Sequence, residues 1–177
     1  MRPCTRPKRW VGTKLWLDRQ RINQLMEEAI DLALEAKRKG EVPVGAIVVG
    51  PKGQVMGRAN NSCIALNDPT AHAEILAIRE ACSKVANYRL TDALIVCTLE
   101  PCWMCFGAIM NARISGLIYS LEDPDFGAIS TNNGFRIRGW RPPLIMKGIG
   151  KERYVKIIKE FFEIRRFTAS GEVPKRS

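Results

Sequence analysis

The stretch ALIVCTLEPCWMC, residues 93–105, is the part of the sequence that decides the fold class. Its first seven residues form an apolar run, as expected of a strand that is buried on both faces. Pro101 then stands where proline is preferred, in the first turn of a helix that we expect to continue to about residue 112. A buried strand followed at once by a helix is typical of α/β proteins.

The residues on both sides repeat this alternation of helices and strands. Apolar residues at three- and four-residue spacing predict a helix at 21–39. Further helices are predicted at 71–83, 101–112 and 152–166. Apolar runs predict strands at 44–49, 54–59, 93–99, 117–119 and 144–146, the first two joined by the turn sequence GPKG. This order predicts a three-layer α/β/α sandwich around a mixed central sheet of about five strands.

Composition narrows the class of protein. The chain has 177 residues, of which 46% are hydrophobic and 26% charged, a balance that excludes a disordered or fibrous protein. The net charge of +10 favours polyanionic partners. No apolar run approaches the ~18 residues of a membrane span, and the basic start has no stretch of signal-peptide length. We therefore expect a cytoplasmic protein that does not associate with membranes.

Three regions are predicted along the chain. Residues 1–20 form a basic amino-terminal arm, residues 21–167 a single domain and residues 168–177 a short tail. A chain of this length is long enough to bury a substantial core in one domain.

Two short segments contain the residues that could perform chemistry. The first, TAHAE, contains His72, the only histidine of the chain, and Glu74. The second, EPCWMC, contains Cys102 and Cys105. One imidazole and two thiolates suit zinc, and three protein ligands leave a fourth position for water. Glu74 is close enough to the histidine to take a proton from such a water without binding the metal.

Simpler interpretations exist for each segment alone. A Cys-x-x-Cys pair can be a redox pair or two buried cysteines, and a lone histidine on a helix is usually packed in the core. A His-x-Glu and a Pro-Cys-x-x-Cys on successive helices that flank a buried strand match the pattern of zinc-dependent deaminases. A redox site would leave His72 and Glu74 without a role.

The sequence resembles the bacterial tRNA-specific adenosine deaminases, within the cytidine/deoxycytidylate deaminase superfamily, over about residues 21–167. The segments EVPVGAIVV, DPTAHAE, NYRL, TLEPCWMC and GAIMNARI occur in the order and spacing of that family. The resemblance implies a cytidine-deaminase-like fold with one Zn²⁺ per subunit. It also implies hydrolytic deamination, by a zinc-activated water, of the wobble adenosine of a tRNA anticodon stem-loop, with an arginine tRNA as the expected substrate.

The resemblance also assigns roles to individual positions. His72, Cys102 and Cys105 would hold zinc, Glu74 would transfer protons, Asn61 would contact the flipped base, Asp123 would lie near the sugar of the target nucleotide, and Phe162, Arg165 and Arg166 would grip the anticodon loop. Aromatic platforms and arginines are what splayed loop bases and phosphates require. Of the neighbouring Phe161 and Phe162, we expect one to be core.

Family members are homodimers, and we expect the same here, because residues 102–110 would form a helix that is apolar nearly all round. The chain departs from the family at Ser62 and Cys63, where arginine is frequent, and at Asp125, near a common lysine. Both departures remove positive charge near the expected RNA path.

Two other functions fit parts of the sequence. A deaminase of a free base or nucleoside, of guanine or cytosine type, would use the same zinc site, but it needs no basic surface. An inactive RNA-binding protein with a structural zinc is the other alternative, although such a protein would have no use for Glu74.

Overall fold

The computed structural model describes residues 17–131 and 144–170, with side chains to residue 166, and the central feature is one five-stranded sheet. The strands are β1 (Gly45–Val49), β2 (Val55–Asn60), β3 (Leu94–Leu99), β4 (Gly116–Leu121) and β5 (Leu144–Lys147), in the order β2-β1-β3-β4-β5. Strand β1 is antiparallel to β2 and β3, whereas β3, β4 and β5 are parallel. The predicted mixed sheet is therefore confirmed.

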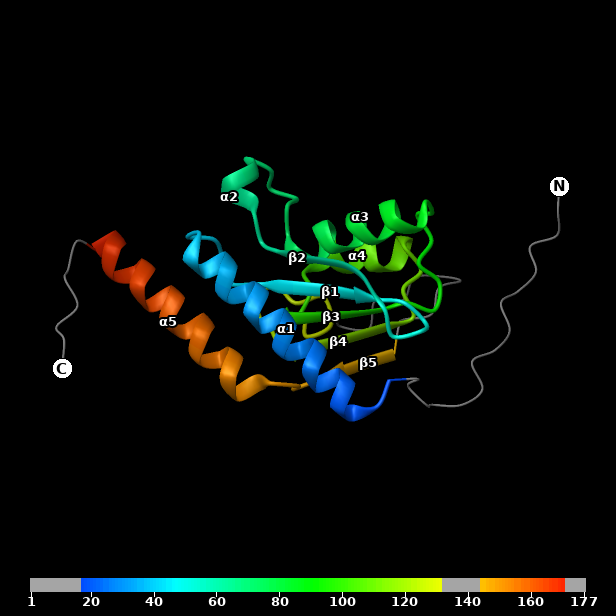
Figure 1. Cartoon of the computed structure of the whole chain (residues 1–177). Coiled ribbons are helices and arrows are strands. Elements are labelled where there is room, and N and C mark those ends of the chain that lie inside the picture. The colour runs from blue at the N-terminus through cyan, green and yellow to red at the C-terminus, as the bar shows by residue number, and fades with distance from the viewer. Residues whose placement is uncertain (1–16, 132–143, 171–177) are drawn as a thin grey trace, which may run out of the picture.

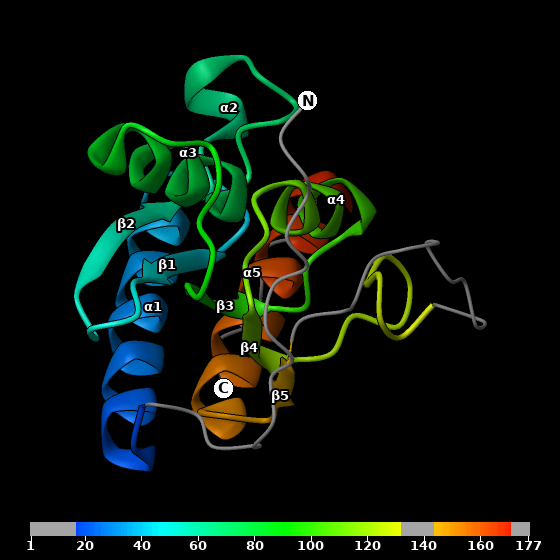
Figure 2. The same ribbon diagram turned by 90° about the vertical axis from the view of Figure 1, so that its right-hand side faces the viewer.

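Helices cover both faces of the sheet (Figures 1 and 2). The helices are α1 (Arg19–Arg38), α2 (Cys63–Leu66), α3 (Ala73–Val85), α4 (Trp103–Asn111) and α5 (Lys151–Ser170). Helices α3 and α4 pack against one face in a first apolar cluster, and α1 and α5 pack against the other face in a second. Figure 2 shows the two pairs on opposite sides of the strands, which is the three-layer sandwich that the sequence predicts.

Two glycines set how closely the helices lie on the sheet. A Cβ atom added to Gly45 of β1 would lie 2.1 Å from the backbone oxygen of Ala29 in α1. On the opposite face, a Cβ added to Gly57 of β2 would lie 2.1 Å from the oxygen of Ala77 in α3. Real Cβ contacts are never this short, so each helix rests directly on a strand backbone and any larger residue would push it away.

Two helix starts differ from the prediction in a way that matters for the site. Helix α3 begins at Ala73 rather than at residue 71, and α4 begins at Trp103 rather than at Pro101. As a result, His72 and Cys102 are the N-cap residues of their helices, with extended backbone. Pro101 precedes the helix instead of occupying its first turn.

The remaining differences lie at the ends and in one short helix. Helix α1 begins at Arg19, where the Asp18 side chain accepts a hydrogen bond from the Arg21 amide, and α5 continues to Ser170. The four-residue helix α2 was not predicted. The rest of the predicted arm, residues 1–16, and residues 171–177 of the predicted tail lie outside the described residues. Within the described ranges, no helix is both long and apolar enough to span a bilayer.

Candidate active site

The predicted site residues follow strands that end at the same edge of the sheet. Because β1 is antiparallel to both β2 and β3, and β4 is parallel to β3, the strands β2, β3 and β4 run in one direction. Asn61 follows β2, Cys102 follows β3 and Asp123 follows β4. The carboxyl ends of these strands therefore bring together residues that lie far apart in the sequence.

His72, Cys102 and Cys105 form the candidate metal site. The Nδ1 atom of His72 lies 3.7 Å from the Sγ of Cys102 and 3.5 Å from the Sγ of Cys105, and all three ligand atoms lie within 4.8 Å of one another. Zinc binds sulfur at about 2.3 Å and imidazole nitrogen at about 2.0–2.1 Å, so tetrahedral ligands lie about 3.6 Å apart. The two separations from His72 match that value, and the donor set fits Zn²⁺.

The two thiols interact strongly with each other and with the imidazole. A hydrogen bond from Cys105, together with one from His72, lowers the pKa of Cys102 to about 4. The hydrogen bond with Cys102 and burial raise the pKa of Cys105, and the hydrogen bond with Cys102 also raises the pKa of His72. The cluster thus holds a thiolate beside the N-termini of two helices, which is the form of cysteine that binds metals.

Glu74 lies in the first turn of α3, beside this cluster. Its side chain is only 4% exposed, and its charge interacts with His72 and Cys102. Burial raises the pKa of Glu74 to about 7. A buried carboxyl group next to a metal site can accept a proton from water and return it to a leaving group.

Asn61 and Asp123 stand on the two loops that flank the metal cluster. Asn61 is buried, and its Oδ1 atom accepts a long hydrogen bond of 4.0 Å from the Cys63 thiol. Asp123 is half-buried, and its Oδ1 atom accepts hydrogen bonds from the amides of Asp125 and Phe126 at 3.1 and 3.0 Å. Asp123 therefore shapes its own turn with one carboxylate oxygen.

Each of these loops is held by a buried carboxylate, Glu41 or Glu100, for which the sequence alone predicts no role. Glu41, 1% exposed, accepts hydrogen bonds from the amides of Ile64 and Ala65 at 2.8 and 2.9 Å, at the start of α2. Glu100, 2% exposed, accepts hydrogen bonds from the loop after β4. Glu41 and Glu100 lie in the motifs EVPVGAIVV and TLEPCWMC. Their presence in these motifs is the one feature of the sequence that could have pointed to a role for them.

Helix α5 extends toward the same end of the molecule as α2 (Figure 1). Phe161 is 5% exposed and Phe162 is 45% exposed, which confirms the prediction that one of the pair is core. The Arg165 guanidinium donates a 2.7 Å hydrogen bond to the backbone oxygen of Gly40 and lies over the Phe161 ring. Arg165 thus ties α5 to the end of α1, while Phe162 and Arg166 face solvent.

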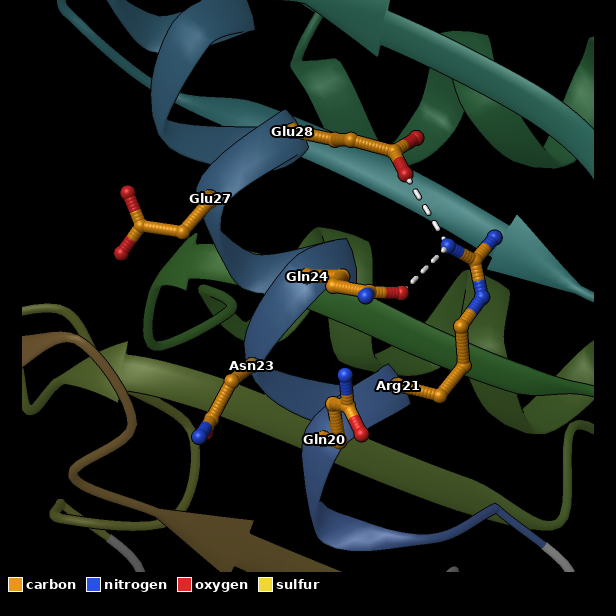
Figure 3. Close-up of a pocket in the computed structure, with 6 residues that line it drawn as sticks. All are labelled: Gln20, Arg21, Asn23, Gln24, Glu27 and Glu28. Atoms are coloured by element: carbon orange, nitrogen blue, oxygen red, sulfur yellow. Dashed lines mark hydrogen bonds and ion pairs between the residues drawn. The ribbon is translucent and has the colours of Figure 1, made fainter.

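A surface hollow elsewhere is separate from this site. Figure 3 shows that it lies along α1, with Arg21 donating hydrogen bonds to Gln24 and Glu28. Helix α1 covers the face of the sheet opposite α3 and α4, and the residues that line the hollow are polar. The hollow therefore contributes nothing to the metal cluster.

Comparison with known proteins gives a family match over more than half of the chain. Residues 19–121 match the family model described as the cytidine and deoxycytidylate deaminase zinc-binding region. A tRNA-specific adenosine deaminase of Buchnera aphidicola subsp. Schizaphis graminum is 40% identical over 143 residues, covering 80% of this chain and 94% of that protein. A solved structure from a study of A-to-I editing by tRNA:A34 deaminases at the wobble position superposes with a TM-score of 0.72. It has 39% identity, and the match covers 76% of this chain and 98% of that one.

A longer relative contains the same domain as one part. A tRNA(Ile)-lysidine synthase of Deinococcus radiodurans is 36% identical over 174 residues, which cover 90% of this chain. This chain spans only 30% of the length of that protein. The domain therefore also occurs joined to a larger polypeptide.

Proposed function

The chain belongs to the zinc-binding cytidine and deoxycytidylate deaminase family and, within it, to the tRNA-specific adenosine deaminases, and we propose that it converts adenosine to inosine at the wobble position of a tRNA anticodon. The observation that carries this proposal is the cluster of His72, Cys102 and Cys105 beside the buried Glu74. We assign this activity to the cytoplasm, with an arginine tRNA as the substrate that the family resemblance implies.

The proposed reaction is a hydrolysis. Water adds its oxygen to the ring carbon that carries the amino group of adenine, and the amino group leaves as ammonia. When bound by His72, Cys102 and Cys105, Zn²⁺ supplies the Lewis acidity that activates water for such an attack. Glu74 accepts the proton of the attacking water and delivers it to the departing amino group. Asn61 and Asp123 orient the base and the sugar of the target nucleotide.

Three features favour an RNA substrate over a free base. The net charge of +10 suits a polyanion, and an aromatic side chain stands exposed on α5 at Phe162. Two relatives at 40% and 39% identity, covered to 94% and 93% of their length, are tRNA-specific adenosine deaminases. Ser62, Cys63 and Asp125 lower the positive charge of the loops beside the site, so we assign more of the phosphate contacts to α5.

The experiment that tests this function is inosine formation in an anticodon stem-loop with adenosine at the wobble position. Zinc-loaded wild-type protein should convert that adenosine and spare the other adenosines of the loop. Free guanine, cytosine and adenosine serve as the competing substrates. Conversion of a free base, with none of the stem-loop, would reject the proposal in favour of a free-base deaminase. An absence of any conversion by zinc-loaded protein would favour the RNA-binding alternative.

We also propose that two copies of the chain form a homodimer. In the single chain, Trp103 and Met104 of the apolar helix α4 are 44% and 37% exposed, and such a surface favours a protein contact. Light scattering at micromolar concentration should give about twice the mass of one 19.9 kDa chain. A single-chain mass at that concentration would contradict the proposal.

The neighbouring phenylalanines of α5 should separate RNA binding from stability. Phe162→Ala should weaken stem-loop binding by roughly tenfold or more, since one stacked base is worth about 1–3 kcal/mol. It should lower the stability by only about 0.5–1.5 kcal/mol, because the half-exposed ring makes an edge contact with Phe161. Phe161→Ala should lower the stability by about 3–5 kcal/mol, because its ring is buried. Equal effects of both substitutions on binding would argue against the assignment of Phe162 to RNA.

A further inference from the structure

The Glu100 carboxylate is the centre of a hydrogen-bond network next to the metal cluster. Its Oε1 atom accepts hydrogen bonds from the amides of Ile129 and Ser130 at 2.8 and 2.7 Å. Its Oε2 atom accepts one from the Asp123 amide at 3.1 Å and another from the Ser130 hydroxyl. Glu100 is 2% exposed, and in the described parts of the chain no ion pair includes it. The partners of this buried acid are therefore all donors of the loop 123–131.

The loop closes tightly around this carboxylate. A Cβ atom added to Gly127 would lie 2.4 Å from the Glu100 Oε1 atom and 2.4 Å from the Asp123 backbone oxygen. Gly127 also donates its amide to that same oxygen at 2.9 Å. The glycine thus allows the backbone to wrap over the carboxylate, a closeness that a side chain would prevent.

The same loop is hydrogen-bonded to the segment that carries a metal ligand. The Ala128 amide donates to the Pro101 oxygen at 2.9 Å, and Gly127 forms an isolated antiparallel bridge with Cys102. The Trp103 ring nitrogen donates to the Thr131 hydroxyl at 3.1 Å. Glu100 therefore stands between the Cys102 segment, to which it belongs, and the loop that begins at Asp123.

We propose that Glu100 is a positioning residue that fixes the loop 123–131 and thereby holds Asp123 beside the segment that carries Cys102. Glu100 accepts from the Asp123 amide and does not touch the substrate. The substrate effect rests on the proposed function, because it acts through the contact of Asp123 with the target nucleotide. The hold on the loop is a property of the chain itself and can be measured without any substrate.

Glu100→Gln is the sharpest test, because glutamine has the same size but only one acceptor oxygen. The NH₂ group of the glutamine would replace one carboxylate oxygen, and it cannot accept the hydrogen bonds that the loop amides donate to that oxygen. We expect the amides of Ile129 and Ser130 to exchange with deuterium roughly tenfold faster or more, as expected for the loss of a hydrogen bond to a charged group. The KM for the stem-loop should rise by roughly the same factor, with kcat changed less than about threefold and zinc still at about one per chain.

Two further variants complete the test. Glu122→Gln is the matched control, because Glu122 is an exposed acid that stands just before the loop and pairs with Lys147. This variant should keep the wild-type rate of amide exchange at residues 129–130 and the wild-type KM. Ser130→Ala removes one donor at an exposed position, so it should shift exchange in the same direction by less. This variant tests the proposal if Glu100→Gln does not fold.

Unchanged exchange at residues 129–130 in the folded Glu100→Gln or Ser130→Ala protein would overturn the role in holding the loop. A fall in kcat at constant KM would overturn the role in positioning substrate. If wild-type protein converts no stem-loop, the proposed function fails, whereas the exchange experiment still decides whether Glu100 holds the loop.

Discussion

Glu74→Gln should lower the rate of deamination by at least roughly a thousandfold while zinc stays bound. General acid–base catalysis by one side chain contributes about 10²–10⁴, and here one group serves both the attacking water and the leaving amine. Glutamine keeps the volume of the buried side chain but cannot accept and return a proton. It also removes a buried acid, so we expect no loss of fold stability. Inosine formation under single-turnover conditions, with zinc measured in the same sample, tests this prediction.

Glu80→Gln is the matched control, because Glu80 also lies on α3 but at the surface. There it forms an ion pair with Lys84 and accepts a hydrogen bond from the Arg58 amide. It should keep wild-type turnover, and Glu74→Gln should keep wild-type affinity for the stem-loop. Turnover within tenfold of wild type in the Glu74→Gln protein would refute the proton-transfer role. A loss of zinc would instead mean that Glu74 supports the metal cluster.

The main elements of the fold could be predicted because their patterns are local. The apolar run 93–99 appears as β3, buried at five of its six positions, and the alternation of helices and strands gives the layers. Helix starts were less accurate, since the prediction places His72 and Cys102 inside the first turns of helices, whereas both are N-cap residues with extended backbone. Extended backbone is usual for an N-cap residue, and spacing patterns do not locate a helix start to within one or two residues.

The supports of the site could not be predicted, because their partners are distant in the sequence. Glu41 holds the start of α2 across 23 residues, and Glu100 holds Ile129 across 29. Sequence periodicity carries no information about such contacts. Helix α2 could not be predicted either. Its apolar side chains Ile64 and Leu66 are 59% and 56% exposed, so the segment has no amphipathic pattern.

Arg165 has a predicted role in RNA binding and an observed role in packing. The resemblance assigns its side chain to the anticodon loop, and this stays a prediction. In the folded chain, the guanidinium already binds the Gly40 oxygen and lies over the Phe161 ring. Arg165 thus has a structural contact within the chain itself, in addition to the predicted contact with RNA.

Cys102→Ala should abolish stoichiometric zinc binding and destabilise the whole domain. In the proposed site Cys102 is one of three zinc ligands. It stands at the N-cap of α4 without a side-chain capping hydrogen bond, so the expected loss of stability comes from the loss of the metal. A ligand present at a thousandfold excess over its Kd stabilises the folded state by about 4 kcal/mol. At about 2–4 °C per kcal/mol for a chain of this size, the melting temperature should fall by roughly 8–16 °C.

Metal removal provides the internal comparison for this variant. Wild-type protein stripped by a chelator should melt near the temperature of Cys102→Ala, because both lack the contribution of zinc to folding. Cys82→Ala should keep one zinc, since Cys82 lies on α3 away from the cluster, with its thiol near the Tyr88 backbone oxygen. If Cys102→Ala retains a full equivalent of zinc, Cys102 is not a ligand. If it loses zinc but melts as wild type does, the metal serves the reaction alone, and the fold of this chain is stable without it.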